Sequence, residues 1–473
     1  MPHLRGCLVV ILVVCSTLSP AAAAAQVPDS VRDSTTRRLV ELARQLEALR
    51  LELRRQTAEL ARRDSLELEK SERRPSAVPP PDQRLRQVSG IATRPFAYRG
   101  AGASVGGYVD LEFARDYGAH TTSFVQHRLI PFILADISDR LHFGTELEFE
   151  YGGPNAGARD DGELKVEFAA IDLNASKALN FRAGALLSPL GKFNLTHDSP
   201  VNDLTDRPLV DQAIIPTTLT EAGAGIFGQL FPSERSVLTY EAYVVNGFDN
   251  NLIEYEVGPG PTVLPTTSIR EARGSMRVDN NSAKSLVGRV AISPLLGLEI
   301  GLSGHSGIYS DSGGGRLNIG VVDAIWARGR WEVLGEAALA GLSVDRANER
   351  ERARRAYQPA LGDTTGFGAA FAAARFAKRQ FGAYVQINYH FLQGAIHGFP
   401  NSTFTGVVRL DHVDFDADST GALQQRLTLG LNWRPIEQSA IKLDYQWNWS
   451  TAPGATRTLP PVNRLVASVA TYF

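Results

Sequence analysis

RLTLGLNWR at 426–434 and IKLDYQWNW at 441–449 are the two stretches that decide the fold. In each of them a large apolar residue occupies every second position, and polar or small residues fill the positions between. Side chains alternate with a period of two in a β-strand, so each stretch predicts a strand with one apolar and one polar face. A short connection, Pro435 to Gln438, separates the two strands.

Strands of about ten residues recur from residue 90 to the C-terminus, which is the strand length that crosses a bilayer. We expect sixteen of them, an even number as in bacterial membrane barrels, at 104–115, 123–136, 140–151, 163–174, 179–187, 222–231, 236–246, 284–293, 296–306, 316–327, 330–343, 380–391, 404–415, 424–434, 438–449 and 463–473.

The polar face of several strands is densely charged, and aromatic residues cluster at strand ends. Both features are typical of an apolar face toward lipid and a wet interior, whereas a soluble all-β domain is the alternative. Beyond residue 25, no stretch has 18 consecutive apolar residues, so no helix is expected to span a membrane. The fold class predicted is therefore an all-β transmembrane barrel of about 16 antiparallel strands, preceded by an N-terminal coiled-coil helix.

The connections between strands alternate in length, which orients the barrel. Short turns are expected on the periplasmic side and long ones on the outer side. The long connections include 188–221, 247–283 and 344–379. Residues 367–376 have strand character, but we place them inside the outer connection 344–379 to preserve this alternation. The connection 392–403 is long for a periplasmic turn.

Three segments precede the barrel at 90–473. Residues 1–25 combine a basic residue, an apolar run and a small-residue cleavage site, and they predict a cleaved signal peptide that contains both cysteines. Residues 26–72 predict a periplasmic coiled-coil helix, with a lone solvated helix as the alternative. Residues 73–89 form a proline-rich linker. The heptad seam of the helix consists of Leu39, Leu42, Leu46, Leu49, Leu53 and Leu60.

The final strand ends in Phe473, a terminal residue that resembles the signal read by the bacterial barrel-assembly machinery. The near-neutral net charge of −2 gives no reason to expect nucleic acid as a partner. Outer-membrane lipid and lipopolysaccharide are the partners expected, and the basic cluster at 346–355 is a candidate contact for lipopolysaccharide phosphates, with an ordinary solvated loop as the alternative.

The stretch GALLSPLGKFNLTHD at 184–198, with the polar and proline-rich residues that follow it to 216, resembles the phosphate-selective porin O and P family. That resemblance implies trimeric, water-filled channels in the bacterial outer membrane for passive diffusion of small hydrophilic solutes or ions, with phosphate-type anions as a candidate solute. Anion selectivity in that family comes from a ladder of interior Arg and Lys residues, and this sequence does not carry an obvious one.

The interior charges are expected to favour cations weakly. Alternation predicts inward-facing cations at Arg128, Lys165, Arg182, Arg289, Arg409, Arg426, Arg434 and Lys442. It predicts inward-facing anions at Asp110, Glu112, Glu146, Glu148, Glu150, Glu167, Asp172, Glu299, Glu332, Glu336, Asp411 and Asp444. Eight cations then face twelve anions, and such charges set ion preference through their field. Weak or mildly cation-favouring selectivity follows.

The connection 188–221 is the third outer loop, which folds inward in sixteen-stranded porins and narrows the pore. We expect Lys192, His197, Asp198 and Arg207 to line its narrowest point. The alternative is a surface loop packed on neighbouring subunits.

No catalytic, cofactor or metal site is expected. Asp411 and His412 are adjacent in a strand, so their side chains point to opposite faces and cannot pair. A row of glutamates at 146, 148 and 150 has oxygen ligands for a divalent cation, but a solvated interior wall is favoured. The runner-up functions are a structural barrel that tethers the outer membrane to a periplasmic partner and, behind it, an outer-membrane barrel enzyme.

Overall fold

The computed structural model describes residues 102–154, 162–258, 262–361 and 366–473. The predicted signal peptide (1–25), coiled-coil helix (26–72) and linker (73–89) lie outside these residues. Within the described ranges, no helix has both the length and the hydropathy needed to cross a membrane.

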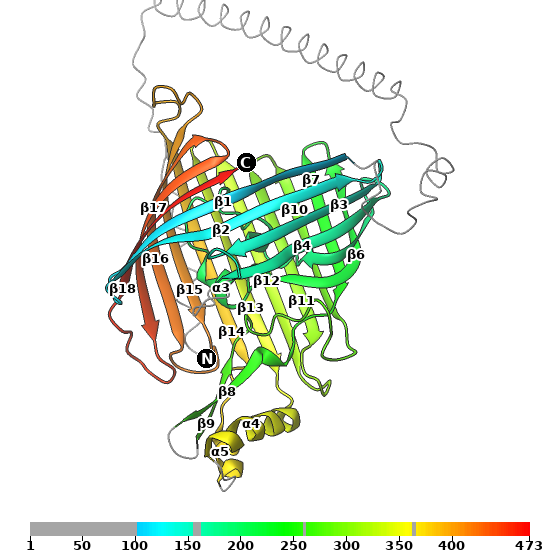
Figure 1. Ribbon diagram of the computed structural model, residues 1–473, viewed down its shortest axis with the longest axis vertical. Coiled ribbons are helices and arrows are strands. Elements are labelled where there is room, and N and C mark those ends of the chain that lie inside the picture. The colour runs from blue at the N-terminus through cyan, green and yellow to red at the C-terminus, as the bar shows by residue number, and fades with distance from the viewer. Residues whose placement is uncertain (1–101, 155–161, 259–261, 362–365) are drawn as a thin grey trace, which may run out of the picture. The chain divides into compact units, whose positions relative to one another are not determined.

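Sixteen strands pair antiparallel, each with its neighbour in sequence, and close into a barrel (Figure 1). The barrel strands are β1 (Gly102–Asp116), β2 (Thr121–Asp136), β3 (Leu141–Glu150), β4 (Glu163–Asn174), β5 (Asn180–Leu187), β6 (Thr220–Ser233), β7 (Ser236–Val245), β10 (Ser285–Leu295), β11 (Leu298–Ile308), β12 (Arg316–Arg328), β13 (Trp331–Ser343), β14 (Arg379–Phe391), β15 (Thr403–Asp414), β16 (Leu423–Ile436), β17 (Ser439–Thr451) and β18 (Val462–Tyr472). The predicted fold class and strand count are confirmed, with strand ends shifted by a few residues.

The first and last strands join at a seam that leaves no open edge. β1 pairs with β18 from Tyr108 opposite Tyr472 to Asp116 opposite Arg464. Beyond the last pair, the Phe473 amide donates to the Gly107 carbonyl at 2.9 Å, and the Gly107 amide donates back at 3.2 Å. Closure satisfies every strand edge without water, which a lipid environment requires.

The outer surface of the barrel is apolar between two groups of aromatic side chains. Near the short turns, rings follow one another across β13 to β16, from Trp331 and Tyr389, 4.6 Å apart, to Phe404 and Trp433, 5.9 Å apart. Near the long connections, Tyr445 and Trp447 pack 4.6 Å apart on β17. Exposed aliphatic side chains lie between, among them Leu129, Ile171, Val290, Leu302, Val322, Val385, Leu410, Leu429, Leu443 and Val469. This arrangement matches the apolar band and aromatic girdles of a membrane barrel.

The polar-in, apolar-out pattern is reversed over the first half of β12. There the polar Arg316 and Asn318 face outward, whereas buried Leu317, Ile319 and Val321 face inward. These inward side chains belong to a hydrophobic core that also contains residues of the 188–219 connection, including Leu190, Val210, Ile214, Ile215 and Leu219. The reversal follows from that packing, because the inward face here meets protein and not water.

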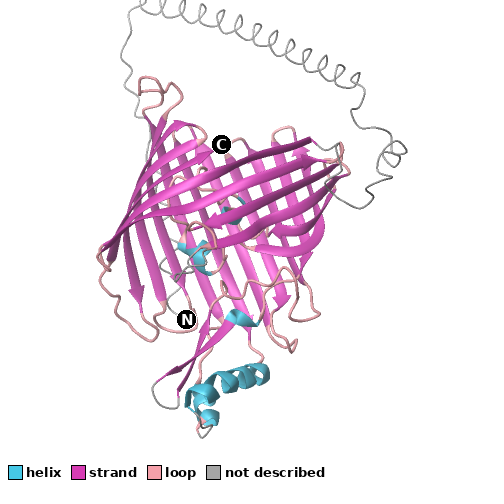
Figure 2. Cartoon of the chain, in the orientation of Figure 1, coloured by secondary structure: helices cyan, strands magenta, loops and turns pink. Residues whose placement is uncertain are grey.

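The long connections carry structure of their own beyond the strand ends (Figures 1 and 2). One contains the hairpin β8 (Ile253–Gly258) and β9 (Thr262–Thr267), and another contains the helices α4 (Arg346–Leu361) and α5 (Phe367–Ala373). The hairpin packs on both helices. Residues 367–376 lie in a connection between barrel strands, as predicted, with a helix where the sequence had strand character; that this connection is on the outer side stays a prediction. The β8–β9 hairpin was not predicted.

Candidate functional site

The connection between β5 and β6, residues 188–219, folds into the barrel and is the candidate functional site. It contains the short helices η2 (Phe193–Leu195) and α3 (Leu209–Ala213), and α3 contacts β14, β15 and β16. Figure 2 shows these helical turns within the ring of strands. We call residues 188–219 the inner loop. The alternative of a surface loop is wrong, because most of this segment is buried against the inner wall.

Cationic side chains on β15 to β17 hold the backbone of the inner loop. Lys442 Nζ donates to the carbonyl of Ser199 at 2.6 Å, and Arg409 Nη2 donates to that of Asp206 at 3.0 Å. Arg426 donates to the Arg207 carbonyl at 2.5 Å, and Arg434 to the carbonyls of Pro200 at 2.5 Å and Val201 at 2.8 Å. An irregular buried segment has carbonyls without secondary-structure partners, and these cations satisfy them.

Carboxylates of the inner wall satisfy amides of the same loop. Glu336 Oε2 accepts from the amides of Lys192 at 2.8 Å and Phe193 at 3.2 Å. Asp444 accepts from the Thr205 amide at 2.6 Å, and Asp411 from the Leu209 amide at 3.0 Å. Asp444, Asp411, Arg409, Arg426 and Lys442 are therefore on the inner face, as alternation predicts, but the inner loop covers them.

The four residues predicted for the constriction contact different parts of the inner wall. Lys192 pairs with Glu299 on β11 at 3.0 Å, and His197 Nε2 lies 3.3 Å from Glu167 on β4. Asp198 accepts from the Tyr472 hydroxyl on β18 at 2.7 Å. Arg207 donates within the loop, to the carbonyl of Thr217.

The gap beside His197 and Arg207 is narrow. These two residues line a cavity of about 20 Å³ together with Arg128 on β2 and Arg409 on β15. A cavity of this size holds about one water molecule. Lys192 and Asp198 are not among its lining residues, so the structure brings together two of the four predicted residues here.

The predicted glutamate row lies on the inner wall, and two of its three members pair with cations. Arg128 Nε is 2.9 Å from Glu148 and 3.0 Å from Glu150, and Lys165 also pairs with Glu148. Glu146, the third member, is also buried. These pairs reduce the repulsion between Glu148 and Glu150.

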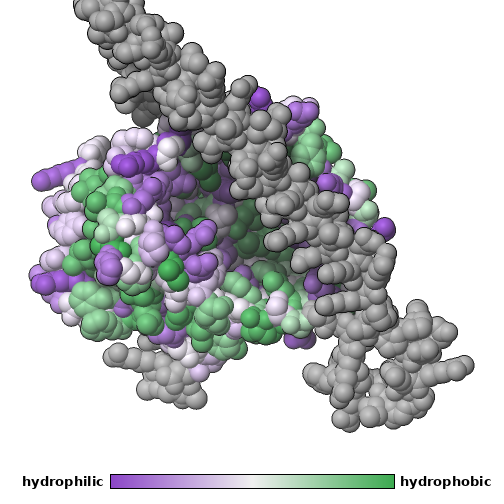
Figure 3. Space-filling model, turned by 90° about the horizontal axis from the view of Figure 1, so that it is seen from above, coloured by the Kyte–Doolittle hydropathy of each residue, from purple (hydrophilic) through white to green (hydrophobic). Residues whose placement is uncertain are grey.

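A wider cavity lies at the end of the barrel that carries the short turns. Its volume is about 560 Å³, and its charged lining consists of Asp136, His142, Asp172, Arg182 and Glu241. Arg182 binds Asp172 through two hydrogen bonds of 2.7 and 2.8 Å. Seen from this end, the barrel opens into a hollow with a mixed polar and apolar wall (Figure 3). We call this cavity the vestibule.

Two aspartates of the inner loop have opposite protonation behaviour. Burial alone would raise the pKa of Asp206, but the guanidiniums of Arg464 and Arg426 outweigh it and hold that pKa below its ordinary value. Burial raises the pKa of Asp211 well above its ordinary value, and the neighbouring Glu336 adds to this rise. The charged form of Asp206 is thus favoured, whereas burial favours the protonated form of Asp211.

Several interior charges were missed by reasoning from the sequence. Asp323 on β12 binds Arg289 at 2.6 Å, and Arg464 on β18 binds Asp206 at 2.8 Å. Asp323 continues the inward row of Leu317, Ile319 and Val321, so alternation groups it with apolar residues of the kind that face lipid elsewhere in the barrel. His127 lies at a β-bulge between β1 and β2, which alternation cannot anticipate.

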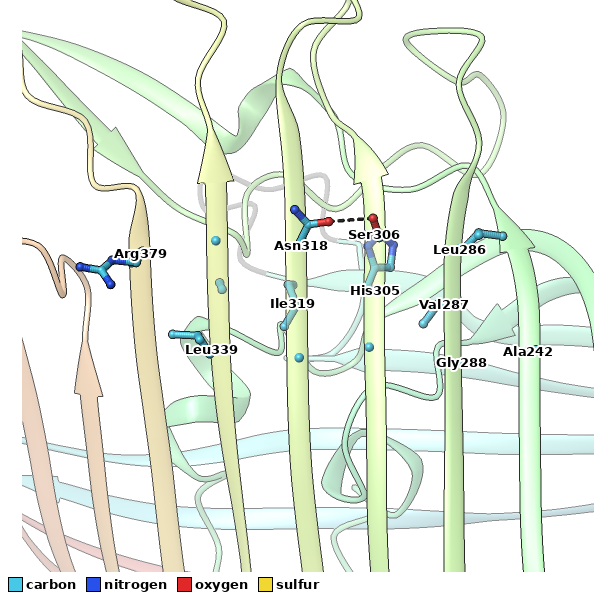
Figure 4. Close-up of a pocket in the computed structure, with 14 residues that line it drawn as sticks. Ala242, Leu286, Val287, Gly288, His305, Ser306, Asn318, Ile319, Leu339 and Arg379 are labelled. Carbon is cyan, nitrogen blue, oxygen red and sulfur yellow. Dashed lines mark hydrogen bonds between the residues drawn. The ribbon is translucent and has the colours of Figure 1, made fainter. Parts of the chain in front are cut away.

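Another groove lies on the outer wall and not in the interior. Small residues line up across neighbouring strands, because Ala242, Gly288, Gly304 and Gly320 are register partners in sequence. Leu286 and Leu339 border the groove (Figure 4). Its volume is about 750 Å³. Because its floor lacks side chains, another chain or a lipid tail can approach the barrel closely here.

The adjacent pair Asp411 and His412 is separated by the sheet. Asp411 points inward to Arg409 at 3.0 Å, and His412 Nδ1 lies 3.2 Å from Gln425 Nε2. The predicted lack of a direct contact between the two side chains follows from strand geometry.

No protein-family model matches the chain. An uncharacterized protein of Aquifex aeolicus (strain VF5) is 27% identical over 383 residues, which cover 76% of this chain and 81% of that protein. The described fold is similar to an anion-selective porin from Comamonas acidovorans, with 12% identity and a TM-score of 0.45 over 79% of this chain and 100% of that one. It is also similar to OmpF of Salmonella typhi, with 9% identity and a TM-score of 0.48 over 78% and 97% of the two chains.

A third similar structure is the outer membrane channel DcaP of Acinetobacter baumannii, with 9% identity and a TM-score of 0.43 over 79% of this chain and 97% of that one. These similarities concern the fold, and the solute that each of these proteins conducts is a property of that protein alone. The resemblance to the phosphate-selective family therefore stays a prediction.

Proposed function

We propose that this chain is a porin of a bacterial outer membrane, through which small hydrophilic solutes or ions diffuse passively. The observation that carries the proposal is the closed barrel, apolar outside between two aromatic groups and charged inside. A closed barrel is the strand-built structure that leaves no unpaired edge in lipid. Export by a cleaved signal peptide and insertion by the barrel-assembly machinery through the strand ending at Phe473 belong to the same proposal.

The inner loop is proposed as the constriction of this channel, with Lys192, His197, Asp198 and Arg207 at its borders. Support comes from its many hydrogen bonds to the wall, which give it one defined position. A segment held in this way narrows the barrel permanently, as a size filter requires. The short turns, together with the vestibule at the same end of the barrel, are assigned to the periplasmic side.

Weak or mildly cation-favouring selectivity is the second part of the proposal. In the vestibule three carboxylates, Asp136, Asp172 and Glu241, accompany one guanidinium, Arg182. Arg409, Arg426 and Lys442 are buried under the inner loop and bind its carbonyls, so their charge is partly engaged before any solute arrives. Phosphate-type anions would need free interior cations, and this arrangement disfavours them.

A homotrimer in outer-membrane lipid is the proposed assembly. The groove at Gly288, Gly304 and Gly320 is the part of the outer wall that we propose for contact with another copy, because missing side chains allow close approach. Mass measurement of the purified protein in detergent tests this, and a monomer at all concentrations would contradict it. Lipopolysaccharide contact is proposed for the exposed Arg354 and Arg355 of α4, although both already pair with Glu351.

Planar-bilayer recording of the refolded protein tests the function. We expect stable conductance steps, and in a salt gradient a small reversal potential with the sign of cation preference. A folded barrel without conductance would contradict the porin proposal and favour a tether. A strong anion preference would leave the porin intact but overturn the proposed selectivity.

A further inference from the structure

A β-bulge between β1 and β2 turns an additional side chain into the barrel. Asp110 pairs with Arg128 and the next residue, Leu111, pairs with Gln126, so His127 has no partner in the ladder. Strict alternation would point His127 outward beside an inward Arg128. Instead, its Nδ1 lies 2.6 Å from Glu112 Oε1 and 3.4 Å from Asp110 Oδ2, both on the inner wall. Bulges commonly re-aim a side chain in this way near functional sites.

The carboxylates that meet His127 are buried and poorly satisfied. Asp110 has no exposed surface, and Glu112 is 8% exposed. Among the described residues, no well-aligned hydrogen bond reaches Asp110 Oδ1, Asp110 Oδ2, Glu112 Oε1 or His127 Nδ1. A single imidazole nitrogen carries at most one proton, so it cannot satisfy both carboxylates. Buried charged oxygens without partners are costly unless a cation compensates them.

The nearby cationic side chains are engaged elsewhere. Arg128 binds Glu148 and Glu150 at 2.9 and 3.0 Å. Lys442 lies in the row of Glu112, two strands away, and donates to carbonyls of the inner loop. The charge of Lys442 also acts on Asp110. Within the described residues, however, neither Lys442 nor Arg128 donates a hydrogen bond to Asp110 or Glu112 Oε1, so these carboxylates keep free lone pairs.

We propose that Asp110, Glu112 and His127 form a binding site for a divalent transition-metal ion of the zinc class. Their candidate ligand atoms all lie within 4.8 Å of one another. Ligands at about 2.0–2.2 Å from zinc in a tetrahedron are about 3.3–3.6 Å apart, so the 3.4 Å separation of Asp110 and His127 already fits. The 2.6 Å contact of Glu112 with His127 must open slightly when the ion enters.

The donor set selects the ion. Imidazole suits zinc and its first-row neighbours, whereas calcium and magnesium prefer oxygen alone. The His127 side chain is 18% exposed, so one side of the cluster is accessible to water. A three-ligand site with an accessible side leaves a coordination position for water or a solute group. No metal site was expected from the sequence, because alternation places His127 on the outer face.

The proposal does not rest on channel activity, so a direct binding experiment tests it. The refolded, chelator-treated protein is titrated with Zn²⁺ in a calorimeter. We expect one equivalent to bind at micromolar concentration, and binding to be lost in Asp110→Asn and His127→Ala. The matched control is His142→Ala, which removes another histidine that contacts one carboxylate, Asp136, at 2.7 Å. That variant should bind Zn²⁺ as the parent does.

The proposal would be overturned if Zn²⁺ binding persisted in both cluster variants, or if it were lost equally in His142→Ala. A parent protein that binds no Zn²⁺ would also overturn it. Co²⁺ provides a readout on the parent protein itself, in case a variant fails to form its barrel. X-ray absorption of the Co²⁺-loaded parent should show one imidazole nitrogen among oxygen ligands. A spectrum with oxygen ligands only would also overturn the proposal.

Discussion

Replacing Asp206 by asparagine is expected to loosen the inner loop. Asp206 Oδ2 accepts from Gln446 at 2.7 Å and from Arg464 at 2.8 Å, and it lies 3.8 Å from Arg426. A hydrogen bond between charged groups contributes about 1.5–3 kcal/mol. Asparagine keeps one acceptor oxygen, and Arg464 is partly exposed, so we take about 2 kcal/mol for the loss. The ratio of detached to docked loop then rises about 30-fold.

The rate of maleimide labelling at Ser199→Cys measures this ratio. Ser199 is 5% exposed in the docked loop, and the only natural cysteines are Cys7 and Cys15 in the predicted signal peptide. Labelling should be about 30-fold faster when Asp206→Asn is added, if it follows the detached fraction. Equal rates with and without Asp206→Asn would refute the reasoning.

Asp211→Asn is the matched control, because burial and Glu336 raise the pKa of Asp211 well above its ordinary value and so favour its protonated form. Asparagine then mimics the protonated acid, so the labelling rate should not rise. The pH dependence has opposite signs for the two residues. The contribution of Asp206, whose pKa is lowered, is lost as the pH falls below about 4. The raised pKa of Asp211 makes the parent less stable as the pH rises above about 4, a trend that Asp211→Asn should remove.

Three further changes test the fold and the inner loop. Gly107→Val should lower the free energy of unfolding of the barrel, measured in urea, by about 1–3 kcal/mol. The reason is steric, because a Cβ at Gly107 would lie 2.3 Å from the Ile130 carbonyl and 2.8 Å from the Phe473 ring at the seam. Gly406→Val, whose Cβ would meet only the Phe391 ring at 3.8 Å, is the control, and equal free energies of unfolding for the two variants would contradict the steric argument. Gly191→Ala should speed labelling of Ser199→Cys, since its Cβ would meet Glu336 Oε1 at 2.1 Å. Gly313 has a similar positive φ, but no atom lies within 4 Å of the position of an added Cβ. A matching increase in labelling for Gly313→Ala would therefore exclude the clash with Glu336 as the cause. Deleting residues 194–210 should raise single-channel conductance, and an unchanged conductance would mean that this segment lies away from the ion path.

The barrel itself was predictable from the sequence because its signal is local. In β16 and β17 each apolar residue alternates with a polar one, and this period alone identifies a strand and its two faces. The lengths of the connections then predicted the end of the barrel at which each connection lies. They also led to the correct placement of residues 367–376 outside the barrel wall. An even number of strands, as in bacterial single-chain barrels, lets the first and last strands pair antiparallel.

The interior depended on contacts between residues far apart in the chain. The inward Leu317 and Ile319 of β12 read as a lipid face until the inner loop is seen to pack on them. Alternation correctly places Lys442 and Arg409 on the inner face. Only the tertiary structure shows that both donate hydrogen bonds to carbonyls of the inner loop. His127 is displaced by one residue at a bulge, which breaks the period on which any sequence argument rests. Alternation specifies the face of the sheet on which a side chain lies. Its hydrogen-bond partner on the inner face depends on how the irregular inner loop pairs its backbone amides and carbonyls inside the closed barrel.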